Sequence, residues 1–305
     1  MNSFGSKFRL NTFGESHGTA VGGIIDGCPA GIAIDYPFIN NELKRRREGD
    51  GHDHDSITSR QESDQIEWLS GLMDGITLGT PIAFLIRNKD CRPKDYDQLR
   101  EVCRPGHADY TYMARYGIRD HRGGGRASGR ETVVRVVAGA VAKQVLKNSG
   151  INIHASFHDH EVDCTIEGLA AGVGNPIFDR LNARLAYAML SIPSAMAFAM
   201  GDTPDAFRLS QQEFPDQWRE GGEGGHLTLT NHCGGIQGGI SNGMPVIFHV
   251  GFHLPPTQPD GMRCRDSHGG IREVVHNGRH DSNHIPRLPV IVEAMAAMVI
   301  LDFIL

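Results

Sequence analysis

The chain has 305 residues, of which 39% are hydrophobic and 22% charged, and its formal net charge is −6. This is the composition of a globular protein with a large core, and an acidic chain is a poor candidate for nonspecific nucleic-acid binding. Six cysteines without C-x-x-C spacing argue against a zinc ribbon or a disulfide scaffold. No signal core or bilayer-spanning run is found, so we expect a cytoplasmic protein without membrane contact.

Apolar runs with a period of two predict strands, and runs with a period near 3.6 predict helices. In chain order, the predicted elements are a strand at 21–25, a helix at 36–47, strands at 66–69 and 80–87, helices at 129–147 and 177–192, strands at 226–230 and 245–250, and a helix at 289–304. Ser128 and Glu131 have capping-box spacing at the start of the clearest helix. The last helix is almost free of polar residues, so we expect it to be buried.

An internal echo indicates that the chain has two related halves. Residues 25–32 (IDGCPAGI) are similar to residues 166–173 (IEGLAAGV), and both segments follow a β-type run and precede a helix. We therefore expect an α+β protein with a single domain over 1–305, made of pseudo-repeat halves at roughly 1–150 and 151–305.

Two short segments each place a histidine among small or turn-forming residues: 13–18 (FGESHG) contains His17, and 104–109 (RPGHAD) contains His107. A dense basic and glycine-rich run follows at 119–130. Glycines allow the backbone to approach a ligand, and histidines exchange protons near neutral pH. The combination suits a substrate that carries phosphate and must lose or gain a proton.

Each of these candidates also has an ordinary structural explanation. A lone histidine is more often a surface group than a catalyst, and the arginines of 45–47 suit a helix C-terminus. Ser128 could be only a helix cap, although a helix N-terminus flanked by Arg126 and Arg130 is also a natural anion site. In the segment 279–281 (RHD), the carboxylate could be an ionised base or only an ion-pair partner.

Two histidine–aspartate runs, 52–55 (HDHD) and 158–160 (HDH), contain residue types that bind metals. No further ligand set with known metal spacing accompanies them, so solvated loops are favoured and no metal is predicted. A metal-dependent hydrolase stays a competing hypothesis. The glycine-rich stretch at 231–240 is neither a Rossmann loop nor a P-loop, so a nucleotide or flavin would bind outside those folds.

Taken together, these segments resemble the chorismate synthase family, in order and over nearly the whole chain. The matching pieces are 14–18, 104–112, 117–142, 174–181, 234–243, 279–281 and 293–295. The resemblance implies a β-α-β sandwich of two similar halves, usually assembled as a homotetramer. It also implies a carbon–oxygen lyase of the shikimate pathway, on the route to aromatic amino acids. Such an enzyme converts 5-enolpyruvylshikimate 3-phosphate to chorismate by 1,4-elimination of phosphate.

The same resemblance implies reduced FMN as a cofactor, without net redox change. We expect no extra domain that could reduce a flavin, so an external reductant would be needed, with NADPH as an indirect electron source.

The resemblance also implies a role for individual residues. His17 matches the histidine that protonates the departing phosphate, His107 the histidine near the flavin pyrimidine edge, and Asp281 the carboxylate that helps flavin N5 take the ring proton. The residues implied in substrate binding are Ser16, Arg46, Arg104, Arg130 and Arg287. Those implied in FMN binding are Arg46, Arg126, Ala127, Ser128, Pro193, Ser194, Gly238, His253, Leu254, Pro255, Pro256, Thr257 and Arg279.

The chain departs from the family pattern in its flavin segments. Where the family usually has Arg-Ser-Ser, this chain has RAS at 126–128. A Lys-Pro-Thr-Ser-type segment of the family is replaced by HLPPT at 253–257, and Arg-His-Asp-Pro-Cys is replaced by RHDSN at 279–283. An arginine expected soon after the basic cluster is displaced by the loop at 49–55. Between about residues 155 and 164 the chain lacks a helix and a strand that most members have. The alternative function is therefore a non-catalytic or weakened paralogue that binds a phosphorylated ligand.

Overall fold

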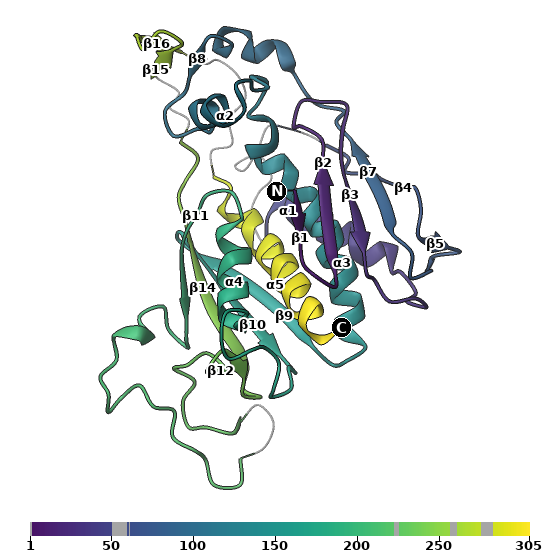
Figure 1. The fold of residues 1–305 in the computed structure, drawn as a ribbon, viewed down its shortest axis with the longest axis vertical. Helices are drawn as coiled ribbons and strands as arrows, with labels where there is room; N and C mark the ends of the chain where they lie inside the picture. The colour runs from purple at the N-terminus through teal and green to yellow at the C-terminus, as the bar shows by residue number, and fades with distance from the viewer. Residues whose placement is uncertain (1, 51–59, 61, 223–225, 257–260, 276–282) are drawn as a thin grey trace.

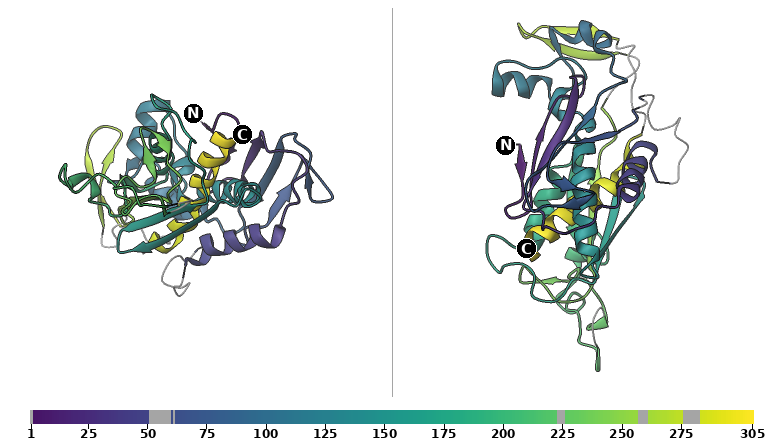
Figure 2. Two further views of the ribbon diagram at one scale, coloured as in Figure 1. Left: turned by 90° about the horizontal axis from the view of Figure 1, so that it is seen from below. Right: turned by 90° about the vertical axis from the view of Figure 1, so that its right-hand side faces the viewer.

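The computed structural model describes residues 2–50, 60, 62–222, 226–256, 261–275 and 283–305 (Figure 1). Two antiparallel sheets lie on either side of a layer of helices, and the three views agree on this arrangement (Figures 1 and 2). The first sheet has the order β1 (Ser3–Phe4), β2 (Arg9–Phe13), β3 (Ala20–Asp26), β7 (Ile82–Arg87) and β4 (Ile66–Trp68). The second has the order β11 (Ala195–Met200), β14 (Val246–Phe252), β10 (Glu161–Glu167) and β9 (Asn152–His158).

The two sheets have the same topology. Apart from β1, the order β2-β3-β7-β4 in the first sheet corresponds to β9-β10-β14-β11 in the second. In both halves a hairpin is followed by a helix, a strand, a two-stranded ribbon, a strand and a final helix. The intervening elements are α1 (Tyr36–Glu48) with β5 (Leu72–Met73) and β6 (Ile76–Thr77), and α4 (Leu181–Leu190) with β12 (Ile236–Gln237) and β13 (Ile240–Ser241). The predicted α+β class with two similar halves is confirmed, and the boundary near residue 150 stays a prediction.

The halves meet where their final helices, α3 (Thr132–Lys147) and α5 (Leu288–Ile304), pack against each other. Every residue from Leu288 to Asp302 is buried, as the sequence predicted for an apolar helix without a polar face. Gly139 makes this close approach possible, because a Cβ atom there would lie 2.3 Å from the Cα of Ala294. The centre of the molecule is therefore a helix–helix contact between two halves.

A buried ionic network joins the same elements. Both oxygens of Glu293 on α5 accept hydrogen bonds from Arg45 on α1, at 2.8 and 3.0 Å, and Lys143 on α3 donates to the same carboxylate. Burial by itself raises the pKa of Glu293, but these hydrogen bonds and positive charges outweigh it and hold the pKa below its ordinary value. The ion pairs also reach Glu42, so three helices share one charge-balanced cluster.

A smaller sheet joins the segments that connect each outer sheet to its final helix. Its strands are β16 (Ile271–Val274), β15 (Met262–Asp266) and β8 (Val102–Cys103), and the helix α2 (Asp109–Tyr116) follows β8. Leu99, Met262 and Cys264 form a separate small core beneath it. The long connections of the two halves are thereby held together.

Three predictions of local structure need correction. The predicted strand at 226–230 is wrong, since these residues contain only one isolated bridge, between Trp218 and Thr228. The helix predicted at 177–192 is shorter and spans Leu181–Leu190. The helix predicted from residue 129 starts with a 3₁₀ turn at Gly129–Glu131, and the α-helix begins at Thr132. Ser128 caps that turn by accepting a hydrogen bond from the amide of Arg130, whereas Glu131 pairs with Arg135 instead of completing a capping box. Among the described residues, no helix has both the length and the apolarity needed to cross a membrane.

Candidate active site

A cavity of about 500 Å³ lies where the two long connections meet, and both halves line it. Its wall brings together most of the residues implied in catalysis and binding, although they are spread over the whole sequence. The predicted residues that line it are His17, Arg46, Arg104, His107, Ala127, Ser128, Arg130, Pro193, Ser194, His253, Pro255, Pro256 and Arg287.

Four other predicted residues are not in this lining. Ser16 is buried directly behind His17. Arg126 donates to the carbonyl oxygen of Gly14 at 3.0 Å and lines a separate cavity of about 260 Å³. Gly238 lies in the tight turn between β12 and β13, and the Leu254 side chain is exposed. Asp281, Arg279, Thr257 and the run at 52–55 lie outside the described residues.

The contacts of His17 identify which of its ring nitrogens exchanges a proton. The Ser16 hydroxyl lies 2.9 Å from His17 Nδ1 and 3.2 Å from the Gly123 carbonyl oxygen. In either tautomer Ser16 engages Nδ1, which leaves Nε2 as the nitrogen that gains or loses a proton. Tyr96 packs edge-on against the ring, with the centroids 4.8 Å apart. Gly123 cannot be larger, because a Cβ there would lie 2.1 Å from His17 Nδ1.

His107 has the same arrangement in a different segment. Its Nδ1 lies 2.9 Å from the Pro105 carbonyl oxygen, which only accepts hydrogen bonds, so Nδ1 carries the hydrogen and Nε2 exchanges the proton. Gly106 has a φ of 69°, and a Cβ there would lie 2.6 Å from the Cβ of Pro256. The loop that carries His107 is thus packed directly against the connection from the other half.

Asp64 organises two of the arginines that line the cavity. Its side chain is 1% exposed, it forms an ion pair with Arg130 Nη1, and its Oδ2 lies 3.7 Å from Arg46 Nη1. Arg46 is held further by Thr132 at 3.0 Å and by the carbonyl of Gly129 at 2.8 Å. Asp64 adopts a left-handed φ of 48°, a conformation that is strained for a residue other than glycine. The residue with this strained conformation is therefore part of the cavity wall.

Arg130 also carries a donor that suits an anionic ligand. Its Nε donates to Asn88 at 2.9 Å, but Nη2 is buried without a hydrogen-bond partner among the described residues. A buried guanidinium N–H left without an acceptor costs about 1–3 kcal/mol. A phosphate or carboxylate oxygen in the cavity would remove that cost.

Arg104 is fixed by a carboxylate of its own segment. Its amide, Nε and Nη2 all donate to Asp109, at 3.0, 2.8 and 3.1 Å. Burial would raise the pKa of Asp109, but the hydrogen bonds from Arg104 and the charges of Arg104 and Arg119 hold that pKa below its ordinary value. Arg104 is therefore a rigid, permanently charged part of the cavity wall.

Several residues of the lining were missed by the sequence reasoning. Arg60, Glu62 and Asp64 line the cavity from one short stretch of the sequence, and Arg60 donates to Glu62 and to the Ser16 carbonyl. The sequence places a charged residue at every second position from 60 to 64, just before a predicted strand. This alternation is the pattern from which the three residues could have been predicted. His284 was also missed; its Nε2 lies 2.6 Å from the Ser194 hydroxyl.

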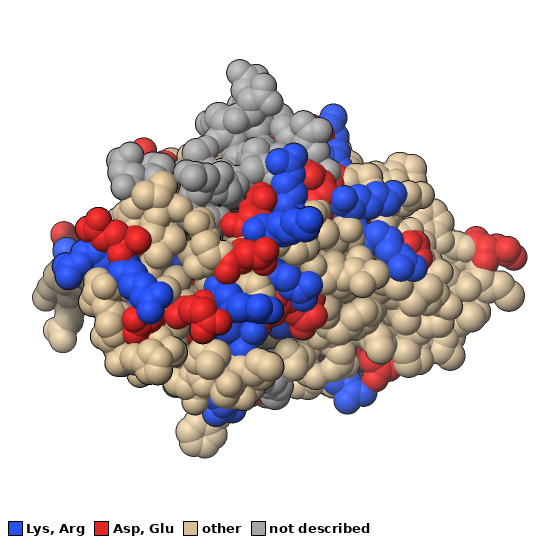
Figure 3. Space-filling model, turned by 90° about the horizontal axis from the view of Figure 1, so that it is seen from above, with Lys and Arg blue, Asp and Glu red and all other residues tan. Residues whose placement is uncertain are grey.

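The wall of the cavity carries more basic than acidic side chains. Seven arginines and three acidic residues are found among the described residues that line it. On the face seen from above, basic and acidic side chains lie next to one another (Figure 3). A mixed surface attracts a polyanion weakly, whereas an arginine-rich cavity favours a small, multiply charged anion.

Comparisons with known proteins give the same assignment. A family model described as chorismate synthase matches residues 8–160 and 160–305. The chain belongs to the chorismate synthase family. It is 40% identical to chorismate synthase of Azobacteroides pseudotrichonymphae genomovar. CFP2 over 354 aligned positions, which cover 100% of this chain and 99% of that protein. It is 42% identical to chorismate synthase of Porphyromonas gingivalis, with 99% and 95% covered. A crystal structure of chorismate synthase superposes with a TM-score of 0.70 at 25% identity, covering 98% of this chain and 92% of that one.

The family match divides at residue 160, and the alignment of 354 positions exceeds the 305 residues of the chain. In the structure, Asp159 and His160 form the tight turn that joins β9 directly to β10, with Asp159 at a φ of 46°. This agrees with the predicted lack of a helix and a strand between about residues 155 and 164.

The cavity has the features that a flavin requires. Its volume falls within the range of about 300–1,000 Å³ typical of cofactor sites. Ile192, Leu288 and Ile291 supply an apolar wall, and the glycines at 123, 124 and 129 leave room for a ligand to contact the backbone. The buried Nη2 of Arg130 can donate a hydrogen bond to an anionic group. The residues present therefore fit a planar ring system with an anionic tail.

Proposed function

We propose that this cavity is the active site of a chorismate synthase that eliminates phosphate from 5-enolpyruvylshikimate 3-phosphate. The supporting observation is that residues from the whole length of a chain of this family converge on one cavity with two proton-exchanging histidines and seven arginines. In the reaction the C–O bond to phosphate and a ring C–H bond break, and a new double bond forms. Two leaving species, phosphate and a proton, must therefore be handled in one site.

The chain's own residues account for the handling of phosphate. Arg46 and Arg130, which Asp64 holds in position, bind the substrate's anionic groups, together with Arg104 and Arg287. His17 protonates the departing phosphate from Nε2, because Ser16 engages Nδ1. Phosphate thereby leaves as a less basic and better leaving group.

His107 would hold a proton on Nε2, next to the pyrimidine edge of a bound flavin. Reduced FMN, when bound, supplies electron density for C–O cleavage and recovers it at the end. Pro193, Ser194, Ala127, Ser128, His253, Pro255 and Pro256 line the part of the cavity that would hold it. We further propose Asp281 as the group that assists removal of the ring proton.

The finer description of the enzyme is also part of this proposal. We propose that the protein is a carbon–oxygen lyase acting on a phosphate and that it is a cytoplasmic homotetramer. Its flavin would be reduced by an external reductant that draws on NADPH. The alternative, a paralogue without turnover, is not favoured, since His17, His107 and the arginines are all in place.

The decisive experiment is an anaerobic assay of the full chain with 5-enolpyruvylshikimate 3-phosphate and chemically reduced FMN. We expect chorismate and phosphate in equal amounts, and no product with oxidised FMN. The Porphyromonas gingivalis relative serves as the positive control. Binding of the substrate without any chorismate, under conditions where the relative turns over, would establish the non-catalytic alternative.

A further inference from the structure

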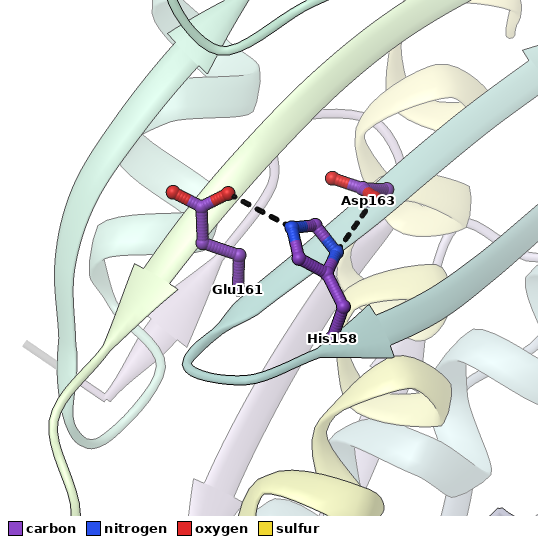
Figure 4. Close-up of side chains that lie close together, drawn as sticks. All are labelled: His158, Glu161 and Asp163. Carbon is purple, nitrogen blue, oxygen red and sulfur yellow. Dashed lines mark ion pairs between the residues drawn. The ribbon is translucent and has the colours of Figure 1, made fainter.

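A cluster of three side chains lies outside the cavity, on the outer face of the second sheet. His158 at the end of β9 pairs directly with Glu161 at the start of β10, and Asp163 follows two residues later on the same face. The three side chains point toward one another (Figure 4). One donor atom from each of them lies within 4.8 Å of the other two. None of the three lines the active-site cavity.

The contacts within this cluster call for a cation. His158 Nε2 lies 3.3 Å from Glu161 Oε2, and Nδ1 lies 3.1 Å from Asp163 Oδ2. A neutral imidazole donates only one hydrogen, so one of its nitrogens would face a carboxylate with its lone pair. Either a second proton on the ring or a metal ion between the donors removes that repulsion. A divalent ion would also balance both carboxylates.

A buried residue orients one of the donors. His249 on β14 pairs with Asp163 across the sheet, and its Nδ1 lies 2.5 Å from Asp163 Oδ1. Its Nε2 lies 3.1 Å from the Gly201 carbonyl oxygen, and the residue is only 7% exposed. Both of its ring nitrogens thus face acceptors, as those of His158 do, so His249 is held between Asp163 and the backbone. Partners of this kind fix the direction of carboxylate ligands in metal sites and raise their affinity.

The cluster also depends on the turn at which the family match divides. The family match divides at residue 160, within the two-residue turn that sets His158 opposite Glu161. A longer connection at this point would not require that pairing. The arrangement is therefore a property of this chain's shortened hairpin and not of the catalytic cavity.

We propose that His158, Glu161 and Asp163 bind a divalent transition-metal ion, of which Zn²⁺ is the probe of choice. One imidazole nitrogen with two carboxylate oxygens suits Zn²⁺ and its neighbours, whereas Mg²⁺ and Ca²⁺ favour oxygen ligands alone. Zn–ligand distances near 2.1 Å place tetrahedral donors about 3.4 Å apart. The donors lie up to 4.8 Å apart, and the two carboxylates face different ring nitrogens. Binding therefore requires one carboxylate to move by about 1.4 Å toward the nitrogen that the other one faces, which rotations of side chains exposed by 34–57% allow. Water completes the coordination.

Titration of the chelator-treated full chain with Co²⁺ and Zn²⁺ tests this proposal. We expect one equivalent to bind, with Co²⁺ absorption bands typical of nitrogen and oxygen ligands and no sulfur charge-transfer band. His158→Ala and Asp163→Asn should each weaken binding at least tenfold, and His249→Ala by about 10–100-fold. Zn²⁺ should raise the melting temperature of the wild type but not that of His158→Ala.

His232→Ala is the matched control, because His232 pairs with Asp202 at 2.9 Å elsewhere on the protein. It should bind the metal like the wild type. Binding that is equally strong in His158→Ala, or the absence of stoichiometric binding by the wild type, would overturn the proposal. Since chorismate formation is measured separately in metal-free buffer, neither result bears on the proposed function.

Discussion

The two halves share a strand order but contribute differently to the active site. Six of the seven arginines in the described lining, together with His17 and His107, come from the first half. The second half supplies Arg287 and most of the apolar wall. A repeated scaffold therefore forms the frame of the cavity, whereas its charge is concentrated in the connections of one half.

What the halves contribute equally is the direction of their final helices. Thr132 at the start of α3 and Leu288 at the start of α5 both line the cavity, and an arginine precedes each of them by one or two residues. The N-terminus of a helix carries partial positive charge and free amide donors. Two such ends aimed at one cavity reinforce its preference for anions, beyond the charges of the side chains.

The largest effect is expected from breaking the ionic link between the halves. Glu293→Gln leaves Arg45 and Lys143 buried without their shared carboxylate, and breaking a buried ion pair in this way costs about 3–5 kcal/mol. The midpoint of urea unfolding at neutral pH should fall accordingly. Glu48→Gln, at an exposed pair with Lys44, is the control and should change stability by less than about 1 kcal/mol.

The same variant also has a pH signature. Because the folded-state pKa of Glu293 is lowered from 4.5, the unfolded state binds the proton more readily. Its contribution is therefore present above that value and lost as the pH falls through the lower folded-state pKa. The difference between wild type and Glu293→Gln should shrink on acidification, and a constant difference would contradict the assignment.

A second test compares histidines from the two halves. His17→Ala and His107→Ala each remove a group that we propose transfers a proton, and each should lower kcat by about a hundredfold or more without loss of folding. His253→Ala should instead weaken the binding of reduced FMN, with kcat nearly unchanged at saturating flavin, and His253→Lys should tighten it. Equal losses of kcat in all three alanine variants would remove the distinction between the halves.

A third test addresses how the first half positions its arginines. Asp64→Asn removes the charge shared by Arg46 and Arg130, so the substrate KM should rise by about tenfold or more, the equivalent of 1.4 kcal/mol. Asp95→Asn, at another acidic residue of the lining, is the control. A fall in kcat without a change in KM would assign Asp64 a different role.

The packing of the two final helices gives a smaller effect. Gly139→Ala places a methyl group against the backbone of Ala294, and such overpacking costs about 1–3 kcal/mol. Gly129→Ala meets no atom within 4 Å and should leave thermal stability almost unchanged. If Gly139→Ala were as stable as the wild type, the helices would be able to separate without cost.

The sequence predicted four of the five described α-helices and the strands β3, β4, β7 and β14, but it predicted neither α2 nor the strands β1, β2, β9 and β11. Amphipathic and apolar periodicity identified all the long helices, and the echo after β3 and β10 indicated the repeated halves. The strand at 226–230 failed because short alternating runs are also compatible with irregular chain. The ligand roles of Ser16 and Arg126 stay predictions, and in this structure both side chains also donate to backbone carbonyl oxygens. Periodicity gives the face on which a residue lies, but not the partner that competes for its side chain.

The smallest predicted effect concerns Ser128, for which the sequence left two roles open. Its hydroxyl accepts a hydrogen bond from the Arg130 amide, whereas the start of α5 has no such side-chain cap. Ser128→Ala should therefore lower stability by about 1 kcal/mol. If Ser128 also contacts the flavin, the variant should bind reduced FMN more weakly as well.

Ser128→Asn keeps an acceptor for the cap but changes the surface that faces the cavity. Restored stability with weakened flavin binding in Ser128→Asn would show that both roles belong to one residue, and unchanged flavin binding in both variants would reduce Ser128 to a cap.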